Sequence, residues 1–223
     1  MKVLVFDTET TGLPKKYSIP AFKQSGNWPH LVSISWALLD TENMKIAATY
    51  SSYIIPEGWD IPAEATRIHG ITTEMAVTDG NTLKNAIDMF MSVPCDMVVA
   101  HNAEFDKNVI VNAIIHDLKM PFDHEDEIFQ QGVRCTMKAG TDICKIITSR
   151  GYKWPKLTEL YYHVMKKQIP VEIEHQALYD TLNLVEIVRN SREIRIALGI
   201  DNAVQVHDEG PEIVCRSNQT TRS

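Results

Sequence analysis

Asp7 and Glu9 are the first residues whose types and spacing could do chemistry. They follow an apolar run at residues 2–6 that is rich in strand formers, which predicts a buried strand. In a strand, side chains two positions apart point to the same face, so the two carboxylates are expected to lie together. Carboxylate oxygens are the ligands that hard divalent cations prefer. The pair therefore predicts a metal site, and a solvated strand end is the structural alternative.

Two more polar groups occur where one predicted element gives way to another. The stretch 101–106 follows a second apolar run at 97–100 and ends in Asp106, at the strand-to-helix junction where α/β sheets gather ligands. Capping and helix-dipole roles for Asn102 and Asp106 are the alternative there. The third group runs from His175 to Asp180. Five residues turn a helix by about 140°, so His175 can share a site with Asp180 only from before the helix or its first turn.

These groups have a joint chemical meaning. Two divalent ions about 3.5–4 Å apart stabilise the attacking and leaving oxygens of a phosphodiester, and carboxylates can hold them. The candidate ligands are the four acids Asp7, Glu9, Asp106 and Asp180. A neutral histidine with a pKa near ~6.5 can accept the proton of an attacking water, which is the role expected of His175. The sequence predicts a nuclease that uses two Mg²⁺ or Mn²⁺ ions.

The elements that must position these residues follow an α/β pattern. Strands are predicted at 2–6, 30–39, 46–55, 97–100 and 133–135. Helices are predicted at 82–91, 104–118, 136–147, 156–166 and 176–198, and Pro62 suits the first turn of another. Turn-forming residues at 40–43 predict a hairpin. Three antiparallel strands in a meander, followed by strands that alternate with helices, predict a mixed five-stranded sheet flanked by helices.

Length and charge limit the kind of protein. We expect one domain over residues 1–200 and a polar, flexible tail over 201–223. The formal net charge is -7, and two bound divalent cations would leave about -3, so tight processive binding to long duplex is not expected. No run approaches the ~20 apolar residues of a membrane span and no signal peptide precedes the domain, so we expect a cytoplasmic protein with free thiols.

The motifs resemble those of the DnaQ-like exonuclease family, the DEDDh branch of the ribonuclease H-like fold. The match includes residues 6–13, 101–106 and 175–180, with a further similar segment at 68–72. The resemblance implies 3′–5′ hydrolysis of single-stranded or frayed DNA with release of nucleoside 5′-monophosphates. Asp7 would bridge both metals, Glu9 and Asp180 would complete the first and Asp106 would serve the second, with His175 as general base.

The same resemblance implies a set of substrate-binding residues: Thr8, Thr10, Leu13, His69, Asn102 and Phe105. The backbone at Thr10 and the Glu9 carboxylate would hold the 3′-hydroxyl. Leu13 and Phe105 would pack beside the last bases, and His69 and Asn102 would line the nucleotide pocket. Core or capping roles remain the alternatives for these four.

Several alternatives stay open. The substrate could be an RNA 3′ end, since the metals act on a phosphate that both polymers share, and a catalytically silent binding module is a third possibility. A DNA polymerase partner is also open, because residues 201–223 show no clear clamp-binding or polymerase-binding peptide. The 14–29 loop could cover the site or be a surface insertion. Residues 153–156, Lys-Trp-Pro-Lys, could contact phosphates and stack on a base, or simply pack on the core.

Overall fold

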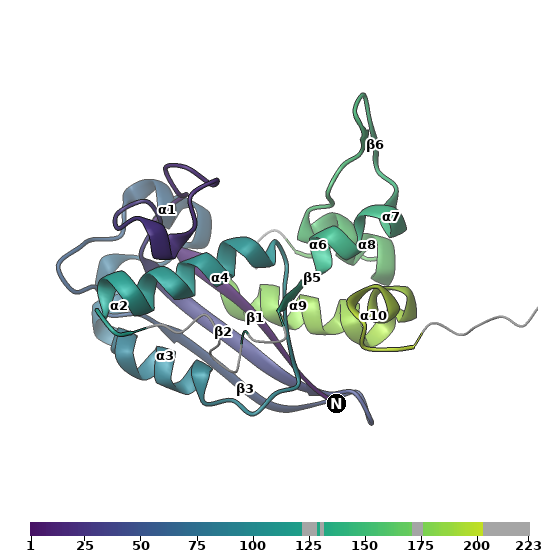
Figure 1. Ribbon diagram of the computed structural model, residues 1–223, viewed down its shortest axis with the longest axis horizontal. Coiled ribbons are helices and arrows are strands. Elements are labelled where there is room, and N and C mark those ends of the chain that lie inside the picture. The colour runs from purple at the N-terminus through teal and green to yellow at the C-terminus, as the bar shows by residue number, and fades with distance from the viewer. Residues whose placement is uncertain (122–128, 130–131, 171–175, 203–223) are drawn as a thin grey trace, which may run out of the picture.

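A five-stranded mixed sheet forms the centre of the computed structural model, which describes residues 1–121, 129, 132–170 and 176–202. Its strand order is β3-β2-β1-β4-β5 (Figure 1). The strands are β1 (Lys2–Thr10), β2 (Leu31–Asp40), β3 (Lys45–Tyr53), β4 (Met97–Ala100) and β5 (Val133–Cys135). β1, β2 and β3 pair antiparallel, and β4 and β5 run parallel to β1. The predicted ribonuclease H-like sheet, a three-stranded meander plus parallel strands, is confirmed.

Helices cover both faces of this sheet. They are α1 (Ala63–His69), α2 (Thr73–Asp79), α3 (Leu83–Met91), α4 (Ala103–Asn112), η2 (Ala113–Asp117), α6 (Thr136–Ala139), α7 (Thr141–Cys144), α8 (Leu157–Met165), α9 (Ala177–Asn190) and α10 (Arg192–Leu198). In Figure 1, α3 and α4 lie on one side of the sheet and α9 on the other. Within the described residues, no helix combines the length and apolar character that crossing a bilayer requires.

The alternation of side chains along β1 assigns its two faces. Leu4 and Phe6 are fully buried in the cluster that includes residues of α3 and α4, and the Phe6 ring lies 5.0 Å from that of Phe90. Val3 and Val5 belong to a second cluster, which α9 completes. Odd-numbered residues of β1 therefore face α9, and even-numbered residues face α4.

Three predicted elements end differently in the structure. β1 continues to Thr10, so Asp7 and Glu9 lie within the strand. The single helix predicted at 176–198 is wrong, because the chain is extended at Ser191 and its hydroxyl accepts a hydrogen bond from the Ile194 N–H as the cap of α10. The helix predicted at 136–147 is also wrong. It is two short helices followed by a hairpin of β6 (Ile147–Thr148) and β7 (Gly151–Tyr152).

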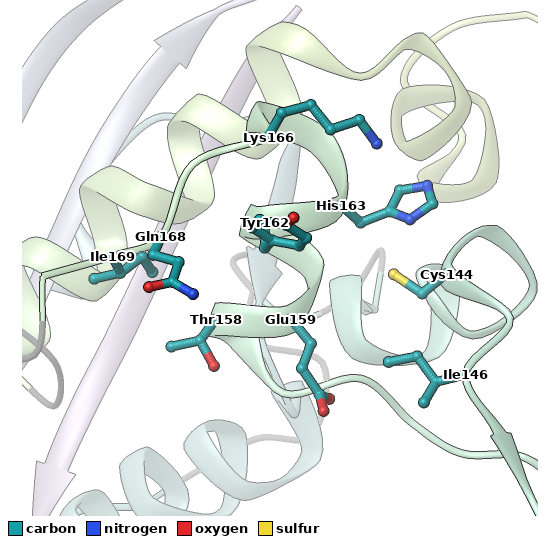
Figure 2. A pocket seen from close by; sticks show the side chains of 9 residues that line it. All are labelled: Cys144, Ile146, Thr158, Glu159, Tyr162, His163, Lys166, Gln168 and Ile169. Atoms are coloured by element: carbon teal, nitrogen blue, oxygen red, sulfur yellow. The ribbon is translucent and has the colours of Figure 1, made fainter.

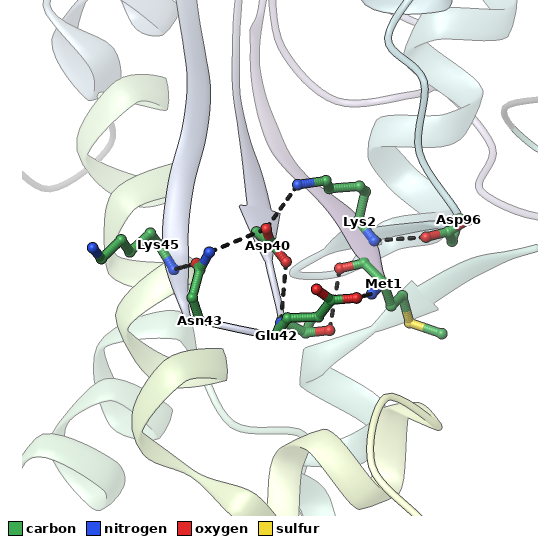
Figure 3. Close-up of polar contacts among 8 residues, drawn as sticks. Met1, Lys2, Asp40, Glu42, Asn43, Lys45 and Asp96 are labelled. Carbon is green, nitrogen blue, oxygen red and sulfur yellow. Dashed lines mark hydrogen bonds and ion pairs between the residues drawn. The ribbon is translucent and has the colours of Figure 1, made fainter.

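Polar contacts fix the sheet at the end opposite the carboxyl end of β1 (Figure 3). The Lys2 ammonium lies 2.8 Å from the Asp40 carboxylate, and the Lys2 backbone N–H donates to Asp96 at 2.6 Å. Asp40 also accepts from the Glu42 backbone and the Asn43 amide in the turn between β2 and β3. These contacts tie β1, β2 and the start of β4 together at this end, where Lys2 lies opposite Asp40 in the sheet.

The loop at 14–29 packs on α4 and is not a loose insertion. A short 3₁₀ turn, η1 (Ala21–Lys23), lies against α4, where the Ala21 N–H donates to the buried Asn108 side chain at 2.8 Å. His116 contacts the Ala21 carbonyl at 2.8 Å, and the Trp28 ring packs 5.8 Å from Phe105. The loop is therefore anchored along the helix that carries Asp106.

Candidate active site

Three of the predicted metal ligands converge at the carboxyl end of β1. Asp7 and Glu9 continue the odd-numbered face of the strand toward α9, and Asp180 lies in the first turn of α9. One carboxylate oxygen of each residue lies within 4.8 Å of the other two. Glu9 and Asp180 are each only 9% exposed, so the cluster is recessed into the protein. Strand alternation and the docking of α9 on β1 together produce this cluster.

Asp106 approaches the site from the opposite face of β1. It is 2% exposed, in the first turn of α4, and the Thr8 hydroxyl donates to its carboxylate at 2.7 Å. Thr8 is an even-numbered residue of β1 and so points toward α4. Its hydroxyl therefore holds a carboxylate in this structure, and the predicted contact of Thr8 with substrate stays a prediction.

The crowding of acids changes their protonation. Burial, followed by repulsion from Asp180 and Asp106, raises the pKa of Glu9 to about 9. The pKa of Asp7 is raised well above its ordinary value, first by burial and then by Asp106, Glu9 and Asp180. Burial raises the pKa of Asp106 to about 7, although hydrogen bonds from Thr8 oppose this. Oxygen donors whose charges repel one another fit a hard divalent cation, because its charge would relieve the repulsion.

A cleft of about 630 Å³ contains this site. Asp7 and Asp180 line it together with Asn102, and residues 154–158 line it as well. Asn102 takes the left-handed conformation, with φ of 63°, and its side chain makes no capping hydrogen bond to α4. The capping alternative for Asn102 is not what the structure shows, and its side chain lies at the cleft.

The other predicted substrate-binding residues lie in different surroundings. Leu13 is 72% exposed after the turn in which the Thr10 hydroxyl donates to the Gly12 carbonyl at 2.7 Å. Phe105 packs partly buried against the main core cluster. His69 is 5% exposed and lines a separate cavity of about 240 Å³ that also includes Tyr179 of α9. The roles of these residues toward substrate stay predictions.

His175 lies outside the described residues. The helix α9 begins at Ala177. The role of His175 as general base stays a prediction.

His101 is a residue of the second motif to which the sequence assigned no role. Its Nε2 lies 3.1 Å from the Pro155 carbonyl, and its Nδ1 lies 3.0 Å from the Thr136 hydroxyl. A carbonyl can only accept, so Nε2 carries the proton and Nδ1 accepts from Thr136. Burial lowers the pKa of His101 to about 4, which keeps the ring neutral. The sequence marked His101 only by its position beside Asn102. Its partner Pro155 lies 54 positions later in the chain, so the contact could not be predicted.

Comparison with known proteins agrees with this arrangement. The family model for exonucleases of the RNase T type matches residues 4–188, a range that includes every predicted catalytic position. The chain belongs to this exonuclease family. A DNA polymerase III subunit epsilon-like protein of Rhodobacter capsulatus is 26% identical over 183 residues, which are 82% of this chain and 22% of that protein. The exonuclease domain thus spans about a fifth of the length of that relative.

Solved structures share the fold at low sequence identity. Exonuclease I of E. coli, in complex with a dT13 oligonucleotide, superposes with a TM-score of 0.61 at 16% identity, over 84% of this chain and 40% of that one. A 3′-exonuclease that recognises a histone mRNA stem-loop gives a TM-score of 0.61 at 16% identity, over 89% of this chain and 64% of that one. These similarities confirm the ribonuclease H-like exonuclease fold.

Proposed function

We propose that the protein is a 3′–5′ exonuclease that uses two divalent metal ions, Mg²⁺ or Mn²⁺, and removes nucleoside 5′-monophosphates from single-stranded or frayed DNA. The observation that carries this proposal is the convergence of Asp7, Glu9 and Asp180, with ligand oxygens within 4.8 Å of one another, at the edge of an open cleft. Membership of an exonuclease family gives the cluster its reaction class.

Each acid has a proposed role. Asp7, Glu9 and Asp180 would hold one metal, and Asp106 would serve the other together with Asp7. When bound, the two ions supply charge stabilisation to the attacking and leaving oxygens of the phosphodiester. Thr8 keeps the Asp106 carboxylate in position through its 2.7 Å hydrogen bond. His175 takes the proton from the attacking water, because a neutral imidazole can accept a proton near neutral pH.

Residues next to the acids are proposed to bind the 3′ end of the nucleic acid. The Thr10 backbone and the Glu9 carboxylate bind the terminal 3′-hydroxyl. Leu13 supports this arrangement because its side chain is 72% exposed, so it can pack beside the last base. Asn102 lines the cleft next to Asp7 and contacts the terminal nucleotide there.

The choice of DNA follows from the relatives. The curated relative carries the name of a DNA polymerase III subunit, and exonuclease I was solved with DNA. The similarity to a 3′-exonuclease that recognises an mRNA stem-loop favours RNA as the second candidate. A polymerase partner, a cytoplasmic location and a domain over residues 1–200 followed by a flexible tail remain predictions.

Digestion of matched DNA and RNA oligonucleotides tests the substrate. Both carry a free 3′-hydroxyl and a 5′ label and are incubated in parallel with Mg²⁺ or Mn²⁺. We expect faster shortening of the DNA, and faster shortening of the RNA would overturn the DNA assignment while keeping the exonuclease.

A further inference from the structure

The charge of the chain is unevenly distributed. Residues 136–167, called the basic segment below, contain seven lysines and arginines and only two acids, Asp142 and Glu159. Their formal charge is +5 in a chain whose total is -7. The basic segment comprises α6, α7, the β6–β7 hairpin and α8, which group together on one side of the molecule in Figure 1. Such a local excess of cations is the electrostatic signature of a surface that binds phosphates.

Trp154 connects the basic segment to the active site. Its side chain is 61% exposed, although tryptophan is usually highly buried. It lines the same cleft as Asp7 and Asp180, and so does the exposed residue Lys156. The cleft thus has carboxylates in one part and an aromatic ring beside an ammonium group in another.

The exposed position of Trp154 is held by contacts on both sides. The carbonyl of the buried residue Pro155 accepts the hydrogen bond from His101 at 3.1 Å. Glu159 accepts from the Lys156 backbone N–H at 2.8 Å and from the Lys153 ammonium at 2.6 Å. These contacts fix the backbone around Trp154, so the ordering cost of binding is limited to the side chain itself.

We propose that the part of the basic segment that lines the catalytic cleft is a second binding site for the substrate strand, in which Trp154 stacks on a base more than one nucleotide upstream of the scissile bond and Lys156 contacts a neighbouring phosphate. The proposal rests on the exonuclease function above. Stacking on an aromatic ring is tolerant of base identity, because every base has a π-face. His101 is a positioning residue in this site, since it ties the Trp154–Lys156 backbone to the end of β4.

A second cavity on the same segment provides the controls. It encloses about 540 Å³ and lies along α8, with Tyr162, His163 and Lys166 projecting from that helix and Cys144 and Ile146 opposite (Figure 2). Neither Asp7 nor Asp180 lines it. Tyr162 is 54% exposed, so it matches Trp154 in exposure and aromatic character but lies outside the catalytic cleft.

The test measures binding of a fluorescent single-stranded 12-mer in Ca²⁺ to the full chain and its variants. We expect Trp154→Ala to weaken binding about 5- to 160-fold, which corresponds to the ~1–3 kcal/mol of one stacked base. Trp154→Phe should keep most of the affinity, and Tyr162→Ala should keep all of it. Lys156→Ala should lower the slope of log Kd against log salt by about 0.7, and Lys84→Ala on α3 should not change the slope.

Turnover gives a second readout. With Mg²⁺, Trp154→Ala should lower kcat/KM several-fold more for the 12-mer than for a dinucleotide, which has only one nucleotide upstream of its scissile bond. Equal losses on both substrates, or unchanged 12-mer binding by Trp154→Ala, would overturn the proposal. Different results would overturn the exonuclease function and the strand-binding site. A wild-type protein that degrades no oligonucleotide but needs Trp154 for binding would refute the exonuclease function and support the strand site.

Discussion

At the level of single residues, the site is governed by the repulsion among its carboxylates. Asp180 is the second largest cause, after burial, of the raised pKa of Glu9, and Asp106 is the third. Ionised acids held together in this way destabilise the folded chain until a cation binds them. Removing one charge should therefore change stability and metal affinity in opposite directions.

Asp180→Asn tests whether stability and metal affinity change in opposite directions. Without metal, the variant should be more stable than the wild type, because Glu9 and Asp7 lose a charge that repels them. Its affinity for Mg²⁺ and its nuclease activity should fall sharply, because one oxygen ligand of the cluster is lost. Urea unfolding in EDTA and calorimetric Mg²⁺ titration measure the two effects. A less stable variant with unchanged Mg²⁺ affinity would contradict the assignment of Asp180 as a ligand.

His175→Ala tests the assignment of the general base. Turnover should fall by roughly 10²–10⁴-fold, the usual contribution of a general base, because the attacking water loses its proton acceptor. Mg²⁺ binding should persist, since the carboxylates are unchanged. Activity assays and calorimetry on the same preparation separate the roles, and loss of Mg²⁺ binding would show that His175 is a ligand instead.

At the level of elements, two features bring the acids together. Side chains alternate between the two faces of β1, and α9 and α4 pack on opposite sides of that strand. Val3 and Val5 bury one face of β1 against α9, and that face continues into Asp7 and Glu9. The opposite face carries Thr8 to Asp106 on α4. One strand thus directs two acids toward α9 and, through Thr8, holds a third acid on α4. The geometry of the site therefore depends on the position of α4 as well as that of α9.

Asn108→Ala tests the anchor between α4 and the 14–29 loop. The buried amide oxygen accepts from the Ala21 N–H, and its nitrogen donates to the Glu104 carbonyl at 2.8 Å. Removing it leaves a buried donor unpaired, so unfolding free energy should fall by about 1–3 kcal/mol. Urea unfolding measures this, with Asn85→Ala on the exposed face of α3 as the control. Equal small effects in both variants would show that the loop is not anchored at this point.

The sequence allowed the five strands of the sheet, α3 and α8 to be located, because their apolar patterns and flanking turn residues are local signals. The interruption at Ser191 was not predictable, since no glycine or proline marks it. The Arg195 side chain donates to the carbonyls of Val188 and Arg189 at the end of α9, a contact that exists only after the two helices have folded together. The β6–β7 hairpin is too short to show a period.

The site, like the fold, could be predicted from the sequence only where the signal was local. Strand spacing alone placed Asp7 beside Glu9, but the approach of Asp106 and Asp180 depends on tertiary packing and was inferred from the resemblance. The hydrogen bond from the Thr8 hydroxyl to Asp106 was not foreseen from the sequence, because the two residues are 98 positions apart. The contact of His101 with Pro155 had no local signal.

At the level of the whole molecule, the formal charge of -7 conceals the basic segment. The net charge of the whole chain indicated no strong basic field. The basic segment nevertheless has an excess of lysines and arginines, and the excess of acids lies in the rest of the chain. Binding of a short stretch of single-stranded nucleic acid near the catalytic cleft fits this charge distribution better than binding along a long duplex.

The dependence of stability on pH follows from the raised pKa of Glu9. Between its ordinary value of 4.5 and about 9, the folded metal-free protein binds more protons than the unfolded chain, so stability falls as pH rises through this range. His101 acts in the opposite sense below 6.5, where its lowered pKa of about 4 makes stability fall with falling pH. Between pH 4.5 and 6.5 the effects of Glu9 and His101 oppose each other, and above pH 6.5 that of His101 ends. Melting temperatures in EDTA should therefore decline as pH rises from 6.5 toward 9.

Mg²⁺ should remove most of the alkaline decline, because a bound cation stabilises the ionised carboxylates. Melting curves at pH 6 and pH 9, with EDTA and with Mg²⁺, measure this. A larger Mg²⁺ effect at pH 6 than at pH 9 would mean that the acids are already ionised without metal.

The two-metal 3′–5′ exonuclease mechanism is tested best by following the shortening of a single-stranded DNA by wild type and Asp7→Ala in Mg²⁺. The substrate carries a 5′ label and either a free 3′-hydroxyl or a 3′-phosphate. We expect the wild type to release nucleoside 5′-monophosphates one at a time from the free 3′ end, with slower attack on the 3′-phosphate. Asp7→Ala should be slower by on the order of a thousandfold, because it loses the ligand shared by both metals. Release of the labelled 5′ nucleotide first, or activity unaffected by Asp7→Ala, would contradict this mechanism.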